Sequence, residues 1–134
     1  MSDAPSSPAD EQVFSVTTLL TYMGNDNKAL AIVSKVVRDA CAPGMAPLDQ
    51  AAQAIADGKP SDAAKIFHGL RGSIGTLGAK RLIIASLAIE QALATSQNQA
   101  IPALLETARV EYRAVLEQGE AWLREHAGPA TPGQ

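Results

Sequence analysis

Apolar residues recur every three or four positions along most of this chain, which is the spacing of one face of an α-helix. The spacing predicts a short first helix over about residues 15–23 and a long second helix over about residues 26–56. Pro43 and Pro47 interrupt the second helix, and a proline in a helix interior removes a backbone hydrogen bond. Because the apolar positions keep one register across both prolines, we expect a single kinked helix rather than two separate ones.

Three further helices are expected, and turn-forming residues bound each of them. They cover about residues 61–77, 79–95 and 102–126. Ser61 is the expected N-cap of the first, Gly78 can take the left-handed conformation at its end, and Pro102 suits the first turn of the last. Long helices with short connections predict an all-α fold, an antiparallel up-and-down four-helix bundle with an additional short N-terminal helix.

The two ends differ in composition from this helical region. Residues 1–12 are rich in Ser, Pro, Ala and Asp, and residues 127–134 consist largely of Gly and Pro with small or polar residues. Such segments are typically flexible. We therefore expect one domain, a helical bundle over residues 13–126, between a flexible N-terminal segment and a flexible C-terminal tail.

The composition agrees with this fold and excludes several classes of function. Hydrophobic residues make up 46% of the chain and aromatic residues only 4%, which favours helices packed through aliphatic side chains. A net charge of −3 provides no basic surface for nucleic acid. No apolar run approaches the roughly 20 residues that cross a bilayer, and no signal peptide is evident. We expect a cytoplasmic protein that contacts neither nucleic acid nor membrane.

The segment of residues 67–79 is unusual because glycines surround a histidine inside a helical pattern. Gly69, Gly72 and Gly75 each cost a helix about 1 kcal/mol relative to alanine. Such departures from local preference are expected where function requires them. The glycines therefore indicate that a partner approaches His68 closely.

His68 lies about 100° from the buried stripe of its helix, so its ring is expected to project, partly exposed, from the side of the bundle. Lys65 and Arg71 lie one turn on either side of it. A neutral imidazole nitrogen is a nucleophile, and flanking cations neutralise phosphate oxygens. This face therefore suits the acceptance of a phosphoryl group. The expected buried stripe is Ala63, Phe67, Leu70, Ile74 and Leu77.

Other chemistry has weaker support in the sequence. His126 is interpreted as structural, Cys41 as a buried thiol, and no His or Cys pair has the spacing of a metal site. A nucleotide-binding loop is also absent from the sequence, so the chain is expected to carry phosphate rather than take it from ATP. His68 as an ordinary surface histidine remains the less specific alternative.

One set of residues carries a resemblance to a known family. The set is His68, Leu70, Arg71, Gly72, Ser73, Leu77, Gly78, Ala79, Leu82 and Glu90. This pattern resembles the signature of histidine-containing phosphotransfer (HPt) domains, and the expected helices match that family's bundle in order and length. Two positions depart from the family: Phe67 replaces a small residue, and Arg71 replaces the usual lysine.

The resemblance implies roles for individual residues. His68 would be the phosphoacceptor, and Arg71 would balance the phosphate charge. Gly72 would give clearance to a docking receiver domain, beside Ser73 at the family's small polar position. Together with two residues of the same helix, they make the expected receiver docking surface: Lys65, Gly72, Ser73 and Gly75. No cofactor of its own is expected, and Mg²⁺ would be bound by the partner receiver domain.

The function predicted from this resemblance is that of a phosphorelay carrier without enzymatic activity of its own. His68 would accept a phosphoryl group from a receiver aspartyl phosphate and pass it to the aspartate of another receiver. The expected partners are response-regulator receiver domains and a hybrid sensor histidine kinase, whose terminal domain this chain could also be, and a monomer is expected. Two alternatives stay open: a docking module that is not phosphorylated, and a small enzyme that uses His68 as general base.

Overall fold

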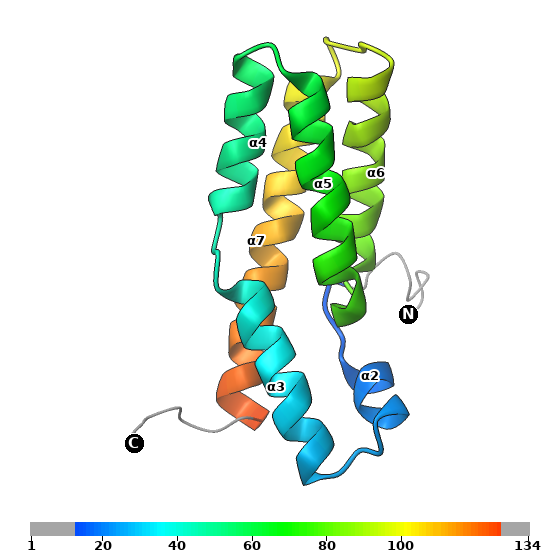
Figure 1. The fold of residues 1–134 in the computed structure, drawn as a ribbon, viewed down its shortest axis with the longest axis vertical. Helices are drawn as coiled ribbons and strands as arrows, with labels where there is room; N and C mark the ends of the chain where they lie inside the picture. Colours follow the sequence, from blue (N-terminus) through cyan, green and yellow to red (C-terminus); the bar gives the residue numbers. More distant parts are fainter. Residues whose placement is uncertain (1–12, 127–134) are drawn as a thin grey trace, which may run out of the picture.

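The structure is a computed structural model that describes residues 13–126, and these residues form helices without any strand. The prediction of an all-α fold is confirmed. The predicted flexible segments, residues 1–12 and 127–134, lie outside the described residues. The helices in Figure 1 are α2 (Thr17–Tyr22), α3 (Asn27–Cys41), α4 (Ala46–Ala56), α5 (Pro60–Ile74), the short 3₁₀ helix η1 (Gly75–Leu77), α6 (Lys80–Ala94) and α7 (Ile101–His126).

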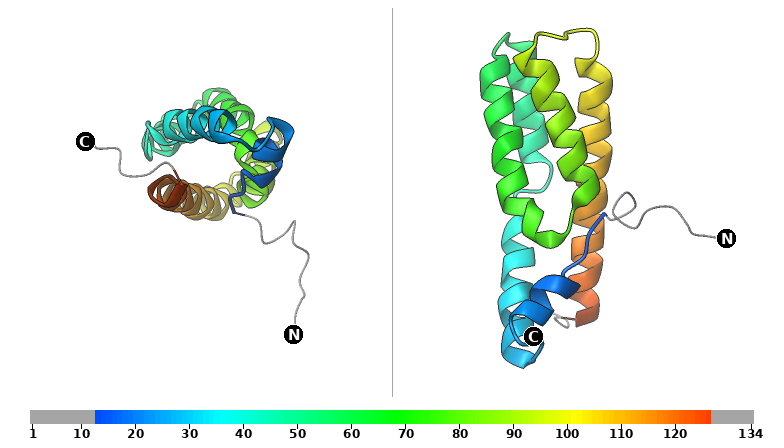
Figure 2. Two further views of the ribbon diagram at one scale, coloured as in Figure 1. Left: turned by 90° about the horizontal axis from the view of Figure 1, so that it is seen from below. Right: turned by 90° about the vertical axis from the view of Figure 1, so that its right-hand side faces the viewer.

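The long helices lie side by side around one core. α5 packs between α4 and α6, and α7 packs against α6 and α3. α3 and α4 follow one another along one side of the molecule (Figure 1), and the end-on view shows the helices around a common centre (Figure 2). The core side chains are mainly aliphatic, with Phe67 and Tyr112 as its largest buried members. In the described part of the chain, no helix combines the length and the apolar character needed to cross a membrane.

The prediction of one kinked helix over residues 26–56 is wrong. The chain leaves the helical conformation between α3 and α4, where residues 42–45 form turns. Gly44 has a φ of +59°, a left-handed conformation that a right-handed helix cannot contain. Pro47 stands in the first turn of α4, where its missing N–H costs no hydrogen bond. The apolar register continues across the break because both helices bury one face in the same core.

Different residues define the starts of α3 and α5. Asp26 is the N-cap of α3, since its side chain accepts a hydrogen bond at 2.8 Å from the backbone N–H of Ala29. Ser61 is not a cap, because α5 begins one residue earlier, at Pro60, whose fixed φ suits the first helical position. Gly78 has the predicted left-handed conformation, with a φ of +66°, between η1 and α6.

Candidate functional site

His68 projects from the outer face of α5. The rotation of this helix is fixed by its buried stripe, in which Phe67 is fully buried and Leu70 nearly so. The whole predicted stripe is buried. His68 follows Phe67 by one residue, and its side chain is 75% exposed. The predicted exposure of the ring is therefore confirmed.

The side chain of Glu90 on α6 lies beside the His68 face of α5. The packing of α6 against α7 sets this orientation. Arg81 of α6 donates to the buried carboxylate of Glu111 on α7 at 2.8 Å. Nine residues later, about 180° round the helix, Glu90 lies on the opposite edge, beside α5. The sequence pattern includes Glu90 as part of the family signature but assigns it no role. Its position depends on how α5 and α6 pack, which a single sequence does not show.

Arg71 and Glu90 form a two-pronged ion pair between α5 and α6. Arg71 Nε donates to Glu90 Oε2 at 2.6 Å, and Arg71 Nη2 donates to Glu90 Oε1 at 2.9 Å. The arginine and glutamate side chains are only 26% and 18% exposed, respectively. Hydrogen bonding to Glu90 raises the pKa of Arg71 above its already high ordinary value, so the guanidinium stays charged. This fork holds a permanent cation in a fixed position beside the imidazole.

The same arginine contacts the histidine ring. Arg71 Nη2 lies 2.9 Å from His68 Nδ1, and Glu90 Oε1 lies 3.9 Å from that nitrogen. Both of these contacts are made by Nδ1, which leaves Nε2 of the largely exposed ring for a group arriving from outside. Arg71, predicted as a cation one turn from His68, thus contacts the ring directly, and Glu90 completes a cluster of three side chains.

The other predicted residues on the His68 face differ in how closely they adjoin the ring. Lys65 is exposed one turn before His68. Gly72 is exposed, and a Cβ atom added there would have no neighbour within 4 Å. Gly75 lies in η1, where a Cβ would be 3.7 Å from the side chain of Ile83 on α6. The fold itself therefore does not require a glycine at position 72.

Ser73 takes a different direction from the rest of the predicted docking surface. It is five residues after His68, which places it about 140° round α5. Its hydroxyl donates to the backbone carbonyl of Leu70 at 3.4 Å, a local contact within the helix. Ser73 therefore does not share the direction of His68, Lys65 and Gly72, with which it was predicted to form a docking surface.

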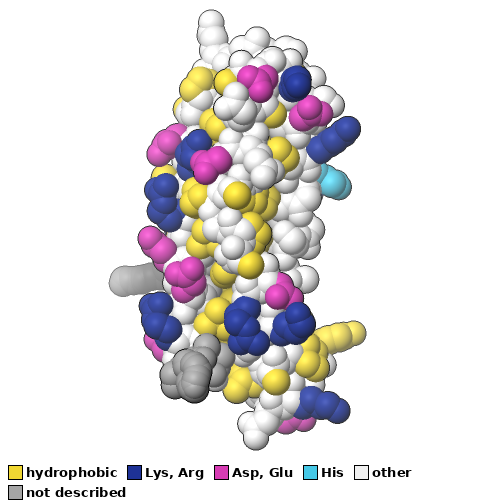
Figure 3. All heavy atoms as spheres, turned by 60° about the vertical axis from the view of Figure 1, so that its left-hand side comes forward, with side chains coloured by type: hydrophobic (Ala, Val, Ile, Leu, Met, Phe, Trp, Pro, Cys, Tyr) yellow, Lys and Arg dark blue, Asp and Glu magenta, His cyan; other side chains and the backbone are white. Residues whose placement is uncertain are grey.

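Apolar side chains of α6 border the His68 face. Ile83 is partly buried against Gly75, and Leu87, three residues before Glu90, is 48% exposed. Neither was predicted as a site residue. The sequence offers one signal, since Leu87 falls outside the buried stripe of α6. Figure 3 shows charged side chains of both signs interspersed on a face of the molecule, with no large patch of one sign.

The exposed imidazole of His68 thus lies beside the fixed guanidinium of Arg71, and the exposed Gly72 lies one turn further along the same face. The chain also matches the family model of the Hpt domain over residues 36–122. The chain belongs to the Hpt domain family. Searches of curated proteins and of solved structures found no significant match. Hpt domains act in histidine phosphotransfer in phosphorelay signalling and interact with receiver domains and kinases of two-component systems. They are phosphate-carrying modules rather than kinases.

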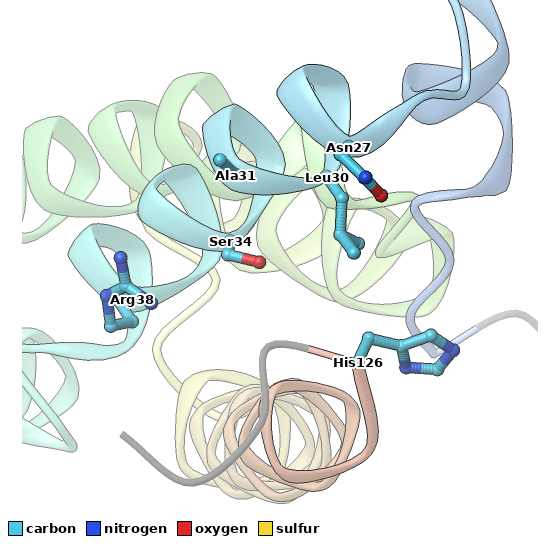
Figure 4. Close-up of a pocket in the computed structure, with 6 residues that line it drawn as sticks. All are labelled: Asn27, Leu30, Ala31, Ser34, Arg38 and His126. Atoms are coloured by element: carbon cyan, nitrogen blue, oxygen red, sulfur yellow. The ribbon is translucent and has the colours of Figure 1, made fainter. Parts of the chain in front are cut away.

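The other histidine of this Hpt domain lies far along the chain, at the end of α7. The ring of His126 stacks on Trp122, with centroids 4.9 Å apart and an angle of 15° between the planes. Its side chain borders a groove between α3 and α7 (Figure 4). The groove residues are Asn27, Leu30, Ala31, Ser34, Arg38 and His126. His68 is not among them, so this groove is separate from the candidate site.

Cys41 does not form a reactive dyad with His68. It lies at the end of α3, which packs against α7, whereas His68 is on the outer face of α5. Burial, and next the charge of Glu120, raise the pKa of the Cys41 thiol above its ordinary value. Within residues 13–126, no group of three or more His, Cys, Asp or Glu side chains is arranged to hold a metal ion.

Proposed function

We propose that His68 of this Hpt domain accepts a phosphoryl group from the aspartyl phosphate of one receiver domain and passes it to the aspartate of another. The observation that carries this proposal is the cluster of His68, Arg71 and Glu90. It combines an exposed imidazole with a cation that a second helix holds in place. The family membership supports the same chemistry.

Each transfer is an in-line displacement at phosphorus. The Nε2 lone pair of His68 forms a bond to phosphorus, while the bond from phosphorus to the aspartate oxygen breaks and its electron pair leaves with the carboxylate. In the second transfer a receiver carboxylate attacks phosphorus, and the electron pair of the P–N bond returns to Nε2. Arg71 offsets negative charge on the phosphoryl oxygens beside the ring. We expect Mg²⁺ to be bound by the receivers, which would supply Lewis-acid assistance.

The surface around His68 suits a docked receiver domain. Gly72 leaves open space next to the ring, and Leu87 offers exposed apolar area on α6. Lys65 adds a cation on the flank opposite Arg71. We infer that α3 and α4 together, with α5, α6 and α7, form an antiparallel four-helix bundle, which gives the docking face a rigid support. We also propose that the domain acts as a monomer and that a hybrid sensor histidine kinase begins the relay.

Replacement of His68 by Gln tests this proposal. The wild-type domain is incubated with a phosphorylated receiver, and the label on the domain is examined for acid lability and alkali stability, which distinguish phosphohistidine. We expect labelled wild-type protein and unlabelled His68→Gln protein with an unchanged circular dichroism spectrum. Label that persists in the variant would refute His68 as the acceptor. Receiver binding by a wild-type domain that is never labelled would instead favour a docking module.

A further inference from the structure

The contact between Arg71 and His68 determines which nitrogen of the ring carries the proton. A guanidinium has only N–H donors and no acceptor. Arg71 Nη2 lies 2.9 Å from Nδ1 of His68, so Nδ1 must offer its lone pair. A neutral imidazole has one protonated and one unprotonated nitrogen. In the structure, the proton of the neutral ring is therefore on Nε2.

This tautomer is not the one that can attack phosphorus through Nε2. An attacking Nε2 needs a free lone pair, so the proton of the neutral ring must be on Nδ1. A proton on Nδ1 would point toward the N–H donors of Arg71, which is unfavourable. It would also point toward the carboxylate of Glu90, which can accept it. Glu90 Oε1 is 3.9 Å from Nδ1, about 1 Å beyond a good hydrogen bond. A small rotation of the ring or of the carboxylate would bring the two together.

We infer that Arg71 and Glu90 act as a tautomer switch for His68. Arg71 holds the unreactive tautomer in the resting domain, and Glu90 accepts the Nδ1 proton in the reactive one. This inference rests on the proposed function, since it assigns Nε2 as the attacking atom. An arriving phosphoryl group carries negative charge and draws the Arg71 guanidinium away from Nδ1. Glu90, then the nearest charged partner, becomes the acceptor for the ring.

The proton balance of the transfer follows from this exchange. Before attack, Nε2 gives its proton to solvent water and Nδ1 takes one from it, so the ring stays neutral. When Nε2 forms the P–N bond, the ring becomes a cation whose Nδ1 proton faces Glu90 and is then released to water. Nδ1 again has a lone pair, which accepts a hydrogen bond from Arg71. Because a protonated ring is the better leaving group, this hydrogen bond protects the phosphoryl group from hydrolysis.

An arginine is suited to this role in a way that a lysine is not. Its Nε and Nη2 atoms bind both carboxylate oxygens of Glu90, while Nη2 also reaches the ring. In the resting domain the planar fork thereby places both possible partners of the ring beside Nδ1. A lysine ammonium is a single flexible point charge and cannot fix both contacts in one geometry. The departure from the family's usual lysine at position 71 thus has a structural consequence.

Nitrogen-15 NMR of the imidazole tests the switch in the unphosphorylated domain, at a pH at which the ring is neutral. The chemical shifts of Nδ1 and Nε2 report the tautomer directly. We expect the wild-type ring to be almost entirely in the Nε2–H form. In Arg71→Met, Glu90 attracts the Nδ1 proton, and the ratio of Nδ1–H to Nε2–H should rise about tenfold or more, as expected for a charge-assisted hydrogen bond. The double variant Arg71→Met with Glu90→Met should fall between the two.

The lifetime of the phosphoryl group gives a second readout. After labelling with the small donor phosphoramidate, Arg71→Met should lose its phosphoryl group several times faster than wild type. Arg109→Met is the matched control, because it removes an arginine–carboxylate pair between α7 and Asp49 of α4, away from the ring. Arg71→Lys keeps the charge and should give an intermediate tautomer ratio if Arg71→Met does not fold.

The two proposals fail in distinguishable ways. Equal tautomer ratios in wild type, Arg71→Met and Arg71→Lys would overturn the switch, whether or not the domain is phosphorylated. A wild-type ring that is mainly Nδ1–H would overturn it as well. A domain whose His68 is never labelled would instead contradict the proposed function, and with it the step that the switch serves.

Discussion

Replacement of Gly72 by alanine should stabilise the domain and impair its function at the same time. Gly72 lies in the last turn of α5, which continues directly into η1, and a Cβ atom at this position would meet nothing within 4 Å. Alanine is favoured over glycine in a helix interior by about 0.8–1.0 kcal/mol. For a domain of this size, such a gain in the free energy of unfolding raises Tm by about 4 °C.

The functional cost arises only when a receiver docks. Gly72 is four residues from His68 and so about 40° from it round the helix, inside the area that a docked receiver must cover. An added methyl group in a closely packed interface typically costs 1–3 kcal/mol, so we expect transfer from a phosphorylated receiver to slow by about tenfold. Labelling of His68 by phosphoramidate should be unchanged, because a small donor needs no such clearance.

Gly69→Ala is the matched control for this experiment. Gly69 is likewise an exposed glycine of α5 with open space around it, but it points about 100° away from His68. It should give the same rise in Tm, measured by circular dichroism, with receiver transfer close to the wild-type rate. Unimpaired transfer in Gly72→Ala would refute the reasoning about clearance. A lower Tm in Gly72→Ala would refute the reasoning about an open helix surface.

Three further predictions concern the core. Ser86 is fully buried and its hydroxyl has no hydrogen-bond partner within the described residues, so Ser86→Ala should raise the free energy of unfolding by about 1 kcal/mol in urea denaturation. Gly119→Ala should not give the gain expected for Gly72→Ala, because its Cβ would lie 2.9 Å from the sulfur of Cys41, and an overpacking cost of about 1–3 kcal/mol offsets the helix preference of about 1 kcal/mol. Since burial raises the pKa of Cys41, less thiolate is present at neutral pH, and alkylation of the folded domain should be slower than that of the urea-unfolded chain and should accelerate as the pH rises.

Helix periodicity predicts the second half of the fold closely. The helix expected over residues 79–95 is observed as Lys80–Ala94, and the turn residues on either side explain the agreement. The first half shows the limit of this reasoning. Gly44 and the neighbouring prolines signal a break, but the continuous apolar register favours one helix. The register persists because α3 and α4 share a core, which is a tertiary effect that local sequence does not reveal.

The candidate site was predictable where it depends on a single helix. The exposure of His68 follows from its offset of about 100° from the buried stripe of α5, and the nearness of Arg71 follows from the spacing of three residues between them. The contribution of Glu90 does not, because nineteen residues and a change of helix separate it from Arg71. The different direction of Ser73 from the rest of the predicted docking surface follows from simple helix geometry. The family signature groups it with the site by sequence alone.

The most direct test of the central claim is transfer between two receivers through this domain. One receiver is labelled with phosphorus-32 on its aspartate, a second is unlabelled, and catalytic amounts of the domain are added. We predict that label appears transiently on the domain and then on the second receiver, and that His68→Gln abolishes both. Transfer between the receivers at the same rate with His68→Gln, or without the domain, would contradict the account.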